Sequence, residues 1–191
     1  MFLSVFLLLQ IGENCRHGCD TGFGHLLAKK LAEDGFCVYA GCLNSTSEGA
    51  CRLRLAENVQ VLQLDVTKEA EINDAFKLIS NSDNGTALWA VVANAGVGSM
   101  GKLEWYSTAQ IRRLFDVNVF GVTSVVLKFL PLLNSQGRIV IVASMFGRMT
   151  APLIVPYSMS KHACISFADG LRRTFYKTGL YVCTIEPTAY R

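Results

Sequence analysis

The sequence predicts an α/β fold with a doubly wound parallel sheet, and three observations lead to this prediction. From residue 22 onward, helical and strand-like segments alternate along the chain. The strand-like segments VVAN, IVIVAS and YVCTIE are almost continuously apolar, which is typical of parallel strands covered by helices on both faces. The 191 residues are 51% hydrophobic and 17% charged, so the chain can bury the core of one domain.

The expected elements follow one another with no repeat, low-complexity tract or internal linker. Apolar periodicity and turn residues predict helices over residues 22–34, 47–57, 68–80 and 107–133. Strands are expected over residues 36–42, 59–66, 88–95, 138–144 and 181–186. A last helix carries Tyr157, because Pro156 suits a helix start and Gly179 marks a stop.

Residues 1–17 form an atypical apolar N-terminal segment before a domain at 18–191. The run 1–11 is shorter than the about 20 residues that span a bilayer, and no basic segment leads it. It fits a signal-like anchor, part of one, or a buried strand. Residues 13–17 make a poor buried strand, so we hypothesise that residues 4–11 supply the first strand through a bulged connection.

Composition argues against several classes of function. The formal net charge of +3 is small and evenly spread, so no nucleic-acid partner is expected. The seven cysteines are odd in number and several lie in apolar runs, which argues against a disulfide framework. Cys15, His17 and Cys19 have no second ligand pair at a usual zinc spacing, so no metal site is expected.

Ser144, Tyr157 and Lys161 suggest a device for proton transfer. Tyr157 and Lys161 are four residues apart, which places both on one face of a helix. A neighbouring cation favours the phenolate and lowers the pKa of a tyrosine, so that it can take a proton from an alcohol. Ser144 would hold the reacting oxygen. Alone, the Tyr-x-x-x-Lys spacing also occurs by chance on helix surfaces.

A glycine cluster opens the first expected helix, with Gly18, Gly22 and Gly24 in the spacing G-x-x-x-G-x-G. Glycines at such a turn let backbone amides and a helix N-terminus approach a pyrophosphate. The same residues also fit a flexible turn without a ligand.

These motifs occur in the order seen in the short-chain dehydrogenases/reductases, which the chain resembles over about residues 18–187. The matching elements are the glycine cluster, Asp65 after a strand, Asn94-Ala95-Gly96 at a strand end, Asn118, and the set Ser144, Tyr157 and Lys161. The resemblance implies a nicotinamide-dependent oxidoreductase, with a Rossmann-like NAD(P)-binding domain over residues 18–191.

The resemblance also implies roles for single residues. Tyr157 would exchange a proton with the substrate oxygen, and Lys161 would lower the pKa of Tyr157 and bind the nicotinamide ribose. Ser144 would polarise the substrate oxygen, and Asn118 would support a proton relay through water. The residues expected at the cofactor are Gly18, Asp20, Thr21, Gly22, Phe23, Gly24, Asp65, Val66, Asn94, Ala95, Gly96, Tyr157, Lys161 and Pro187.

Within that set, Asp65 and Val66 would border the adenine, residues 94–96 the adenine ribose and central cofactor, and Pro187 the nicotinamide end. Two of the residues have structural alternatives. Asn118 also fits a buried helix asparagine that satisfies backbone groups, and Asp65 fits a cap or turn residue.

The segments GCDTGFGH, FCVYAGCLN, LWAVVANAGV, FLPLL and SMFGRM look like the subgroup of retinol, 17β-hydroxysteroid and 3-hydroxybutyrate dehydrogenases. This resemblance implies a hydrophobic alcohol or ketone substrate of retinoid, steroid or hydroxy-acid type. It implies association with the endoplasmic reticulum membrane first, with mitochondria or cytoplasm as alternatives. Gly41 and Cys42 end the expected strand over residues 36–42, which is the second strand in the family pattern. Neither residue is acidic or basic. The absence of an arginine there and the subgroup resemblance favour NAD, with NADP as the alternative.

The chain departs from the family pattern at three places. Residues 13–17 replace the usual first strand, Ala93 and Thr188 replace a usual Asn and Gly, and the chain ends at Arg191, where the family continues with a substrate-covering segment and a further strand. We therefore expect a truncated domain without that C-terminal strand. The alternative to an enzyme is a truncated, non-catalytic dinucleotide-binding or subunit-association domain. The resemblance also implies that the complete protein forms a homo-oligomer, which pairs through the helices that carry Asn118 and Tyr157.

Overall fold

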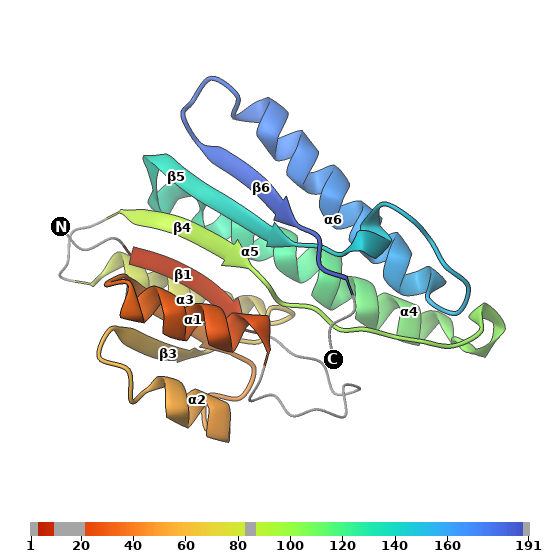
Figure 1. The fold of residues 1–191 in the computed structure, drawn as a ribbon, viewed down its shortest axis with the longest axis horizontal. Helices are drawn as coiled ribbons and strands as arrows, with labels where there is room; N and C mark the ends of the chain where they lie inside the picture. Colours follow the sequence, from red (N-terminus) through yellow and green to blue (C-terminus); the bar gives the residue numbers. More distant parts are fainter. Residues whose placement is uncertain (1–3, 10–21, 83–86, 189–191) are drawn as a thin grey trace.

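The computed structural model describes residues 4–9, 22–82 and 87–188, and these form one parallel six-stranded sheet in the order β3-β2-β1-β4-β5-β6 (Figure 1). The strands are β1 (Ser4–Leu9), β2 (Cys37–Cys42), β3 (Val59–Gln63), β4 (Leu88–Ala93), β5 (Leu133–Val142) and β6 (Tyr181–Ile185). Every neighbouring pair is parallel. The strand order reverses between β1 and β4, which is the doubly wound topology. The predicted fold class is confirmed.

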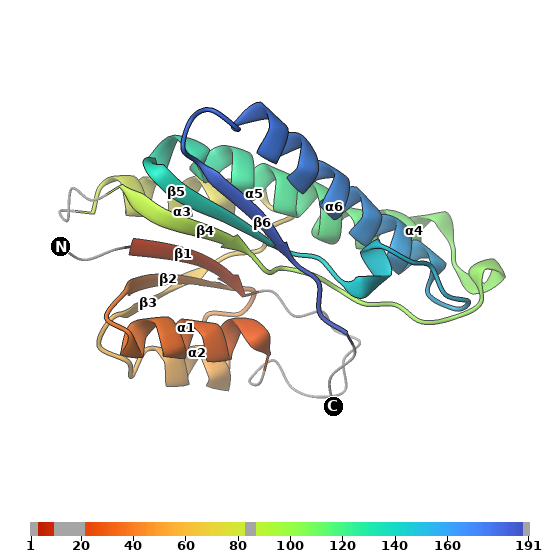
Figure 2. The same cartoon turned by 45° about the horizontal axis from the view of Figure 1, so that its top comes forward.

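Helices cover both faces of the sheet, as Figure 2 shows. One face carries α1 (Phe23–Glu33) and α2 (Glu48–Leu53). The other face carries α3 (Glu69–Ser80), α4 (Thr108–Phe115), α5 (Val122–Phe129) and α6 (Val155–Thr174). The core accordingly has two layers, one against α1 and α2 and a larger one against α3, α5 and α6.

The first strand lies in the middle of the sheet, between β2 and β4. Successive strand residues point to opposite faces, and Val5 and Phe6 accordingly join the two different core layers. Both are buried, with exposed fractions of 1% and 0%, and the Phe6 ring stacks on Phe129 with centroids 4.1 Å apart. The hypothesis that this apolar segment supplies a strand is confirmed over Ser4–Leu9; residues 10 and 11 lie outside the described residues.

The helix expected over residues 107–133 is interrupted. Ser107 starts α4 with a capping box, and α4 then passes into a π-helical segment, Asp116–Gly121, before α5 begins. A Cβ atom at Gly121 would overlap the Val66 side chain, so glycine allows this segment to lie against the end of β3. A 3-10 turn with Pro131 in its first turn, Leu130–Leu132, follows α5.

Among the described residues, Thr108–Leu132 is the one stretch long and apolar enough to cross a membrane by length and composition, and an 18-residue window within it has a mean hydropathy of 1.5. In the fold, 44% of that window is buried. Val125, Val126 and Phe129 account for part of this burial, since they pack into the larger core layer.

Other boundaries differ from the expected ones by a few residues. The helix α2 ends at Leu53 and β3 ends at Gln63, both earlier than expected. The strand β5 begins earlier, because Leu133 pairs with Leu88 before an irregular stretch leads to the pairing of Arg138 with Ala90. The helix α6 ends at Thr174, and Gly179 takes a φ of +84° in the turn that leads to β6.

We predict that Phe6→Ala lowers the free energy of unfolding by about 3 to 5 kcal/mol, because it empties a fully buried site beneath Phe129. Chemical denaturation followed by circular dichroism measures this change. Leu55→Ala serves as the control, since Leu55 is 85% exposed and its loss should change the same free energy by less than about 0.5 kcal/mol. Equal effects of the two substitutions would contradict a central position for β1.

Candidate active site

The carboxyl ends of the strands meet at one edge of the sheet, where a cavity of about 260 Å³ lies at the point of strand-order reversal. Several expected site residues line this cavity together with neighbours that the sequence did not single out. The lining residues are Gly22, Phe23, Asn94, Gly96, Val97, Gly98, Val142, Ala143, Ser144, Tyr157, Lys161, Pro187 and Thr188. The segments that supply them are far apart in the sequence. They are the start of α1, the ends of β4, β5 and β6, and the start of α6.

Tyr157 and Lys161 lie one turn apart on α6 and both line the cavity. The Lys161 Nζ atom is 5.8 Å from the centroid of the Tyr157 ring. Lys161 is only 4% exposed, and its Nζ donates a hydrogen bond of 3.0 Å to the Val142 carbonyl at the end of β5. Burial lowers the pKa of the Lys161 ammonium group, because the charged form loses hydration.

Ser144 follows β5 and begins a short 3-10 turn, Met145–Gly147. Its Oγ accepts a hydrogen bond from the Phe146 N–H at 3.2 Å and donates a long one to the Pro187 carbonyl at 3.5 Å. A Cβ atom at Gly147 would lie 2.8 Å from the Lys161 carbonyl oxygen. The missing side chain of Gly147 therefore lets the turn after Ser144 pack directly against α6.

Asn118 is fully buried in the π-helical segment and does not line the cavity. Its Oδ1 accepts from the Val97 N–H at 2.8 Å, and its Nδ2 donates to the Val97 carbonyl and to Ser160 Oγ, each at 3.0 Å. The Asn118 carboxamide thus satisfies backbone groups of Val97, which is what the structural alternative for Asn118 predicted. Its role in a proton relay stays a prediction.

Gly96 lies where these groups meet. A Cβ atom there would be 3.2 Å from Lys161 Nζ and 3.5 Å from Asn118 Oδ1. Both distances are at or near the limit of ordinary contacts, so any larger residue would press on the ammonium group. By contrast, a Cβ atom at Gly98, which lines the same cavity, would meet nothing within 4 Å.

A second cavity, of about 400 Å³, adjoins the first and shares Val97 with it. Asp65 and Val66 line it, together with Leu43, Thr67 and residues of α4, α5 and the π-helical segment. Asp65 Oδ1 accepts hydrogen bonds from the N–H and the hydroxyl of Thr67, at 3.0 and 2.7 Å. The Asp65 side chain therefore shapes the turn after β3 while it faces the cavity wall.

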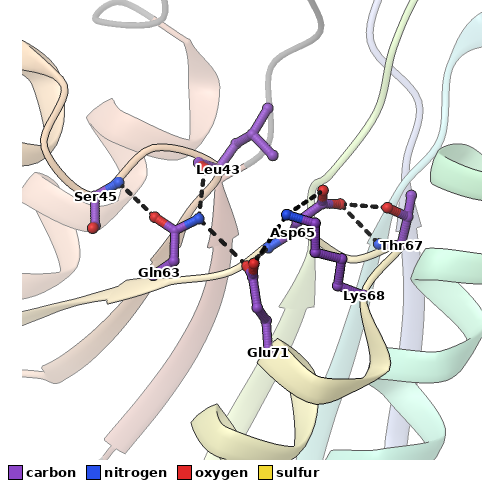
Figure 3. A network of polar contacts seen from close by, with 7 residues as sticks. All are labelled: Leu43, Ser45, Gln63, Asp65, Thr67, Lys68 and Glu71. Carbon is purple, nitrogen blue, oxygen red and sulfur yellow. Dashed lines mark hydrogen bonds and ion pairs between the residues drawn. The ribbon is translucent and has the colours of Figure 1, made fainter.

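A polar network ties the ends of β2 and β3 together beside this cavity (Figure 3). Gln63 donates to the Leu43 carbonyl at 2.8 Å and accepts from the Ser45 N–H at 3.0 Å. The Glu71 carboxylate accepts from the Asp65 N–H at 2.6 Å. It also binds Lys68 at 3.2 Å and Gln63 at 3.4 Å. The network therefore holds the backbone of Leu43 and of Asp65, two residues that line the cavity.

Cys42 occupies the end of β2 and is buried. Burial raises the pKa of its thiol to about 11, against a smaller opposite effect of Arg54. The side chain at this strand end is therefore neutral near pH 7, and Leu43 follows it on the cavity wall.

The remaining expected cofactor residues have mixed positions. Gly22 and Phe23 line the first cavity at the start of α1, and no side chain among the described residues caps that helix. Gly24 is buried within α1, and Ala95 is fully buried and lines neither of the two cavities. Gly18, Asp20 and Thr21 lie outside the described residues.

Sequence reasoning missed an ion pair that braces the site. Arg148 binds Glu186 through two hydrogen bonds, Nε to Oε2 at 2.9 Å and Nη2 to Oε1 at 2.8 Å. Arg148 also holds the pKa of Glu186 below its usual value. Nearby, the Met145 N–H donates to the Pro187 carbonyl at 3.0 Å. These bonds attach the end of β6 to the turn after Ser144. The sequence carries no signal for a pair of surface residues so far apart.

Comparisons with known proteins agree with this architecture. The family model described as short chain dehydrogenase matches residues 17–191. Among solved structures, a short-chain dehydrogenase from Streptomyces avermitilis superposes with a TM-score of 0.85 at 22% identity, over 100% of this chain and 67% of that one. A dehydrogenase/reductase from Sinorhizobium meliloti gives a TM-score of 0.83 at 23% identity, over 97% of this chain and 71% of that one.

Curated relatives are more similar in sequence. Mitochondrial D-beta-hydroxybutyrate dehydrogenase of Bos taurus is 37% identical, over 89% of this chain and 52% of the relative. Retinol dehydrogenase 7 of Rattus norvegicus is 37% identical, over 91% and 55%. Estradiol 17-beta-dehydrogenase 2 of Mus musculus is 39% identical, over 91% and 47%. The chain thus spans about half the length of these relatives. Since the family model covers nearly all of it, the chain belongs to the short chain dehydrogenase family.

Proposed function

We propose that the chain is part of an oxidoreductase that transfers a hydride between NAD(P) and a hydrophobic alcohol or ketone. The observation that carries this proposal is the meeting of Ser144, Tyr157 and Lys161 with the start of α1 around one cavity. Family membership supports it. If the Tyr-x-x-x-Lys spacing were a chance feature of a helix surface, nothing would require Ser144 and the start of α1 to line the same cavity.

The described residues fit a dinucleotide. The N-terminus of α1 lies at the cavity through Gly22 and Phe23, and a helix N-terminus suits a pyrophosphate. The cavity at Asp65 and Val66 suits an adenine, and the cavity at Tyr157 and Lys161 suits the nicotinamide end. The cofactor, when bound, supplies the chemistry of accepting or donating a hydride.

The chain's own residues supply the proton and the orientation. Tyr157 exchanges a proton with the substrate oxygen, and the Lys161 ammonium group beside its ring favours the phenolate. Ser144 Oγ holds the same oxygen in place from the end of β5. Pro187, Gly96 and Val97 line the wall around the reacting groups.

The substrate class follows from the relatives. Their names give hydroxybutyrate, retinol and estradiol as compounds on which they act. We therefore propose a retinoid, steroid or hydroxy-acid type of alcohol for this protein. Location at the endoplasmic reticulum membrane, with mitochondria or cytoplasm as alternatives, stays a prediction for imaging of the tagged protein.

NAD is the proposed cofactor rather than NADP. An acid at the end of β2 usually binds the ribose 2′-hydroxyl and a basic residue usually binds a 2′-phosphate. Here the neutral Cys42 thiol and Leu43 place no cation at the end of β2, and the Asp65 carboxylate lines the same cavity as Leu43. Arg113 lines this cavity from α4 and not from the end of β2.

A second candidate function is a non-catalytic dinucleotide-binding or subunit-association domain. Phe120 in the π-helical segment, Leu127 on α5 and Met159 on α6 are 61%, 52% and 50% exposed. Exposed apolar side chains on these three elements suit contact with a second copy of the chain. A protein that binds NAD and self-associates without turnover would favour this candidate.

We predict that Gly96→Ala weakens NAD binding by about tenfold, since the added methyl group displaces Lys161 Nζ by a few tenths of an ångström and so costs about 1.4 kcal/mol. Isothermal titration calorimetry on the chain measures the dissociation constant. Gly98→Ala is the matched control, because it adds the same methyl group to the same cavity wall without a neighbour within 4 Å. Equal losses in both variants would contradict the assigned position of Lys161.

Tyr157→Phe should lower the rate of NAD-dependent alcohol oxidation by about 10² to 10⁴-fold, because it removes the proton carrier. The dissociation constant for NAD should change by less than about threefold, since the ring remains in place. The rate is followed by NADH absorbance with retinol, estradiol and 3-hydroxybutyrate as substrates. Undiminished turnover in this variant would rule out the proposed mechanism.

Leu43→Arg should raise the affinity for NADP by about tenfold and leave that for NAD nearly unchanged, because it places a cation beside the 2′-phosphate. Calorimetry with both cofactors gives the ratio of dissociation constants. Leu55→Arg, on the exposed surface beyond α2, controls for the added charge. An unchanged ratio would place the adenosine ribose elsewhere.

A further inference from the structure

The helix α6 carries two neighbouring rows of side chains that face the rest of the fold; all are buried except Tyr157, which is half-buried. Tyr157 and Lys161 form the row that lines the cavity. Ser160 and Cys164 form a second row with the same four-residue spacing, with exposed fractions of 0% and 2%. Because both rows belong to one helix, the contacts of the second row set the direction in which the first row points.

The second row binds Asn118 at two different atoms. Ser160 Oγ accepts from Asn118 Nδ2 at 3.0 Å and donates to the Tyr157 carbonyl at 2.7 Å. Cys164 Sγ donates to the main-chain carbonyl of Asn118 at 2.9 Å. Burial raises the pKa of the Cys164 thiol, so the thiol keeps the proton that it donates.

The contact lies where the helix changes to π-helical geometry. The N–H of Val122, four residues beyond Asn118, donates to the Val119 carbonyl. The Cys164 thiol brings a donor to the Asn118 carbonyl from the neighbouring helix.

On its other side, α6 is held through Lys161, whose Nζ binds the Val142 carbonyl of β5. The part of α6 around Lys161 is therefore tied to the sheet on one side and to the π-helical segment on the other. Further along α6, Ile165, Ala168 and Leu171 pack in the core, and Arg172 Nε donates to the Val182 carbonyl. Loss of the Cys164 contact removes one of the two polar contacts that fix the rotation of α6 next to Lys161 on the π-helical side.

We propose that Cys164 is a positioning residue for Lys161, and that its bond to the Asn118 carbonyl fixes the rotation of α6 and thereby the distance between the ammonium group and the Tyr157 phenol. This inference deepens the proposed function, on which its catalytic meaning rests.

The test compares variants that keep or remove the donor. Cys164→Ser retains a donor of similar position, and Cys164→Val retains the volume without the donor. Leu171→Val is the matched control, since Leu171 is a buried residue two turns further along α6 and its side chain carries no hydrogen-bond donor. The readout is the pKa of Tyr157 in the whole 191-residue chain, from the ¹³Cζ chemical shift of labelled tyrosine, with the resonance identified by its loss in Tyr157→Phe.

The pKa of Tyr157 should rise by about 0.5 to 1 unit in Cys164→Val, because the cation retreats from the phenolate. It should stay within about 0.2 unit of the wild-type value in Cys164→Ser and Leu171→Val, in which the donor is kept. An unchanged value in Cys164→Val, or an equal rise in Cys164→Ser, would overturn the proposal.

If Cys164→Val does not fold, Cys164→Ala gives the same comparison without an added methyl group. The measurement requires neither NAD nor turnover, so its outcome is independent of the proposed function. A chain in which Tyr157 responds as expected but no NAD binds would refute the proposed function and leave the positioning role intact.

Discussion

The buried ammonium group of Lys161 is the constraint around which the site is arranged. A charge removed from water is costly unless it is hydrogen-bonded, and here the Val142 carbonyl provides one bond at 3.0 Å. The surrounding glycines give the group its space. Gly96 leaves room beside Nζ, and Gly147 lets the turn after Ser144 rest on the backbone of the same residue. The lysine is therefore held by the ends of two strands as well as by its own helix.

The topology explains why distant residues meet at this point. The reversal of strand order between β1 and β4 opens a crevice at the carboxyl edge, and α1 directs its N-terminus toward it. The network of Gln63 and Glu71 holds the adjoining edge of the sheet. The two cavities share Val97 as a lining residue. This arrangement suits a ligand with two different ends, one in each cavity.

The sequence was sufficient for the fold class because its signals are local or periodic. Apolar runs revealed the strands, and the four-residue spacing of Tyr157 and Lys161 placed both on one helix face, where the structure has them. It could not reveal the π-helical segment around Asn118, because that geometry depends on the close approach of Gly121 to Val66. Tertiary packing brings together Arg148 and Glu186, and it also brings Cys164 to the Asn118 carbonyl. No spacing of residues in the sequence predicts either contact.

The central position of β1 has a consequence for the handling of this protein. Its strand comes from the first few residues of the chain, yet it separates two strands that the chain reaches much later. Displacement of β1 would leave β2 and β4 each with an open hydrogen-bonding edge. Such edges can pair with the same strand from another molecule, which leads to strand exchange and aggregation.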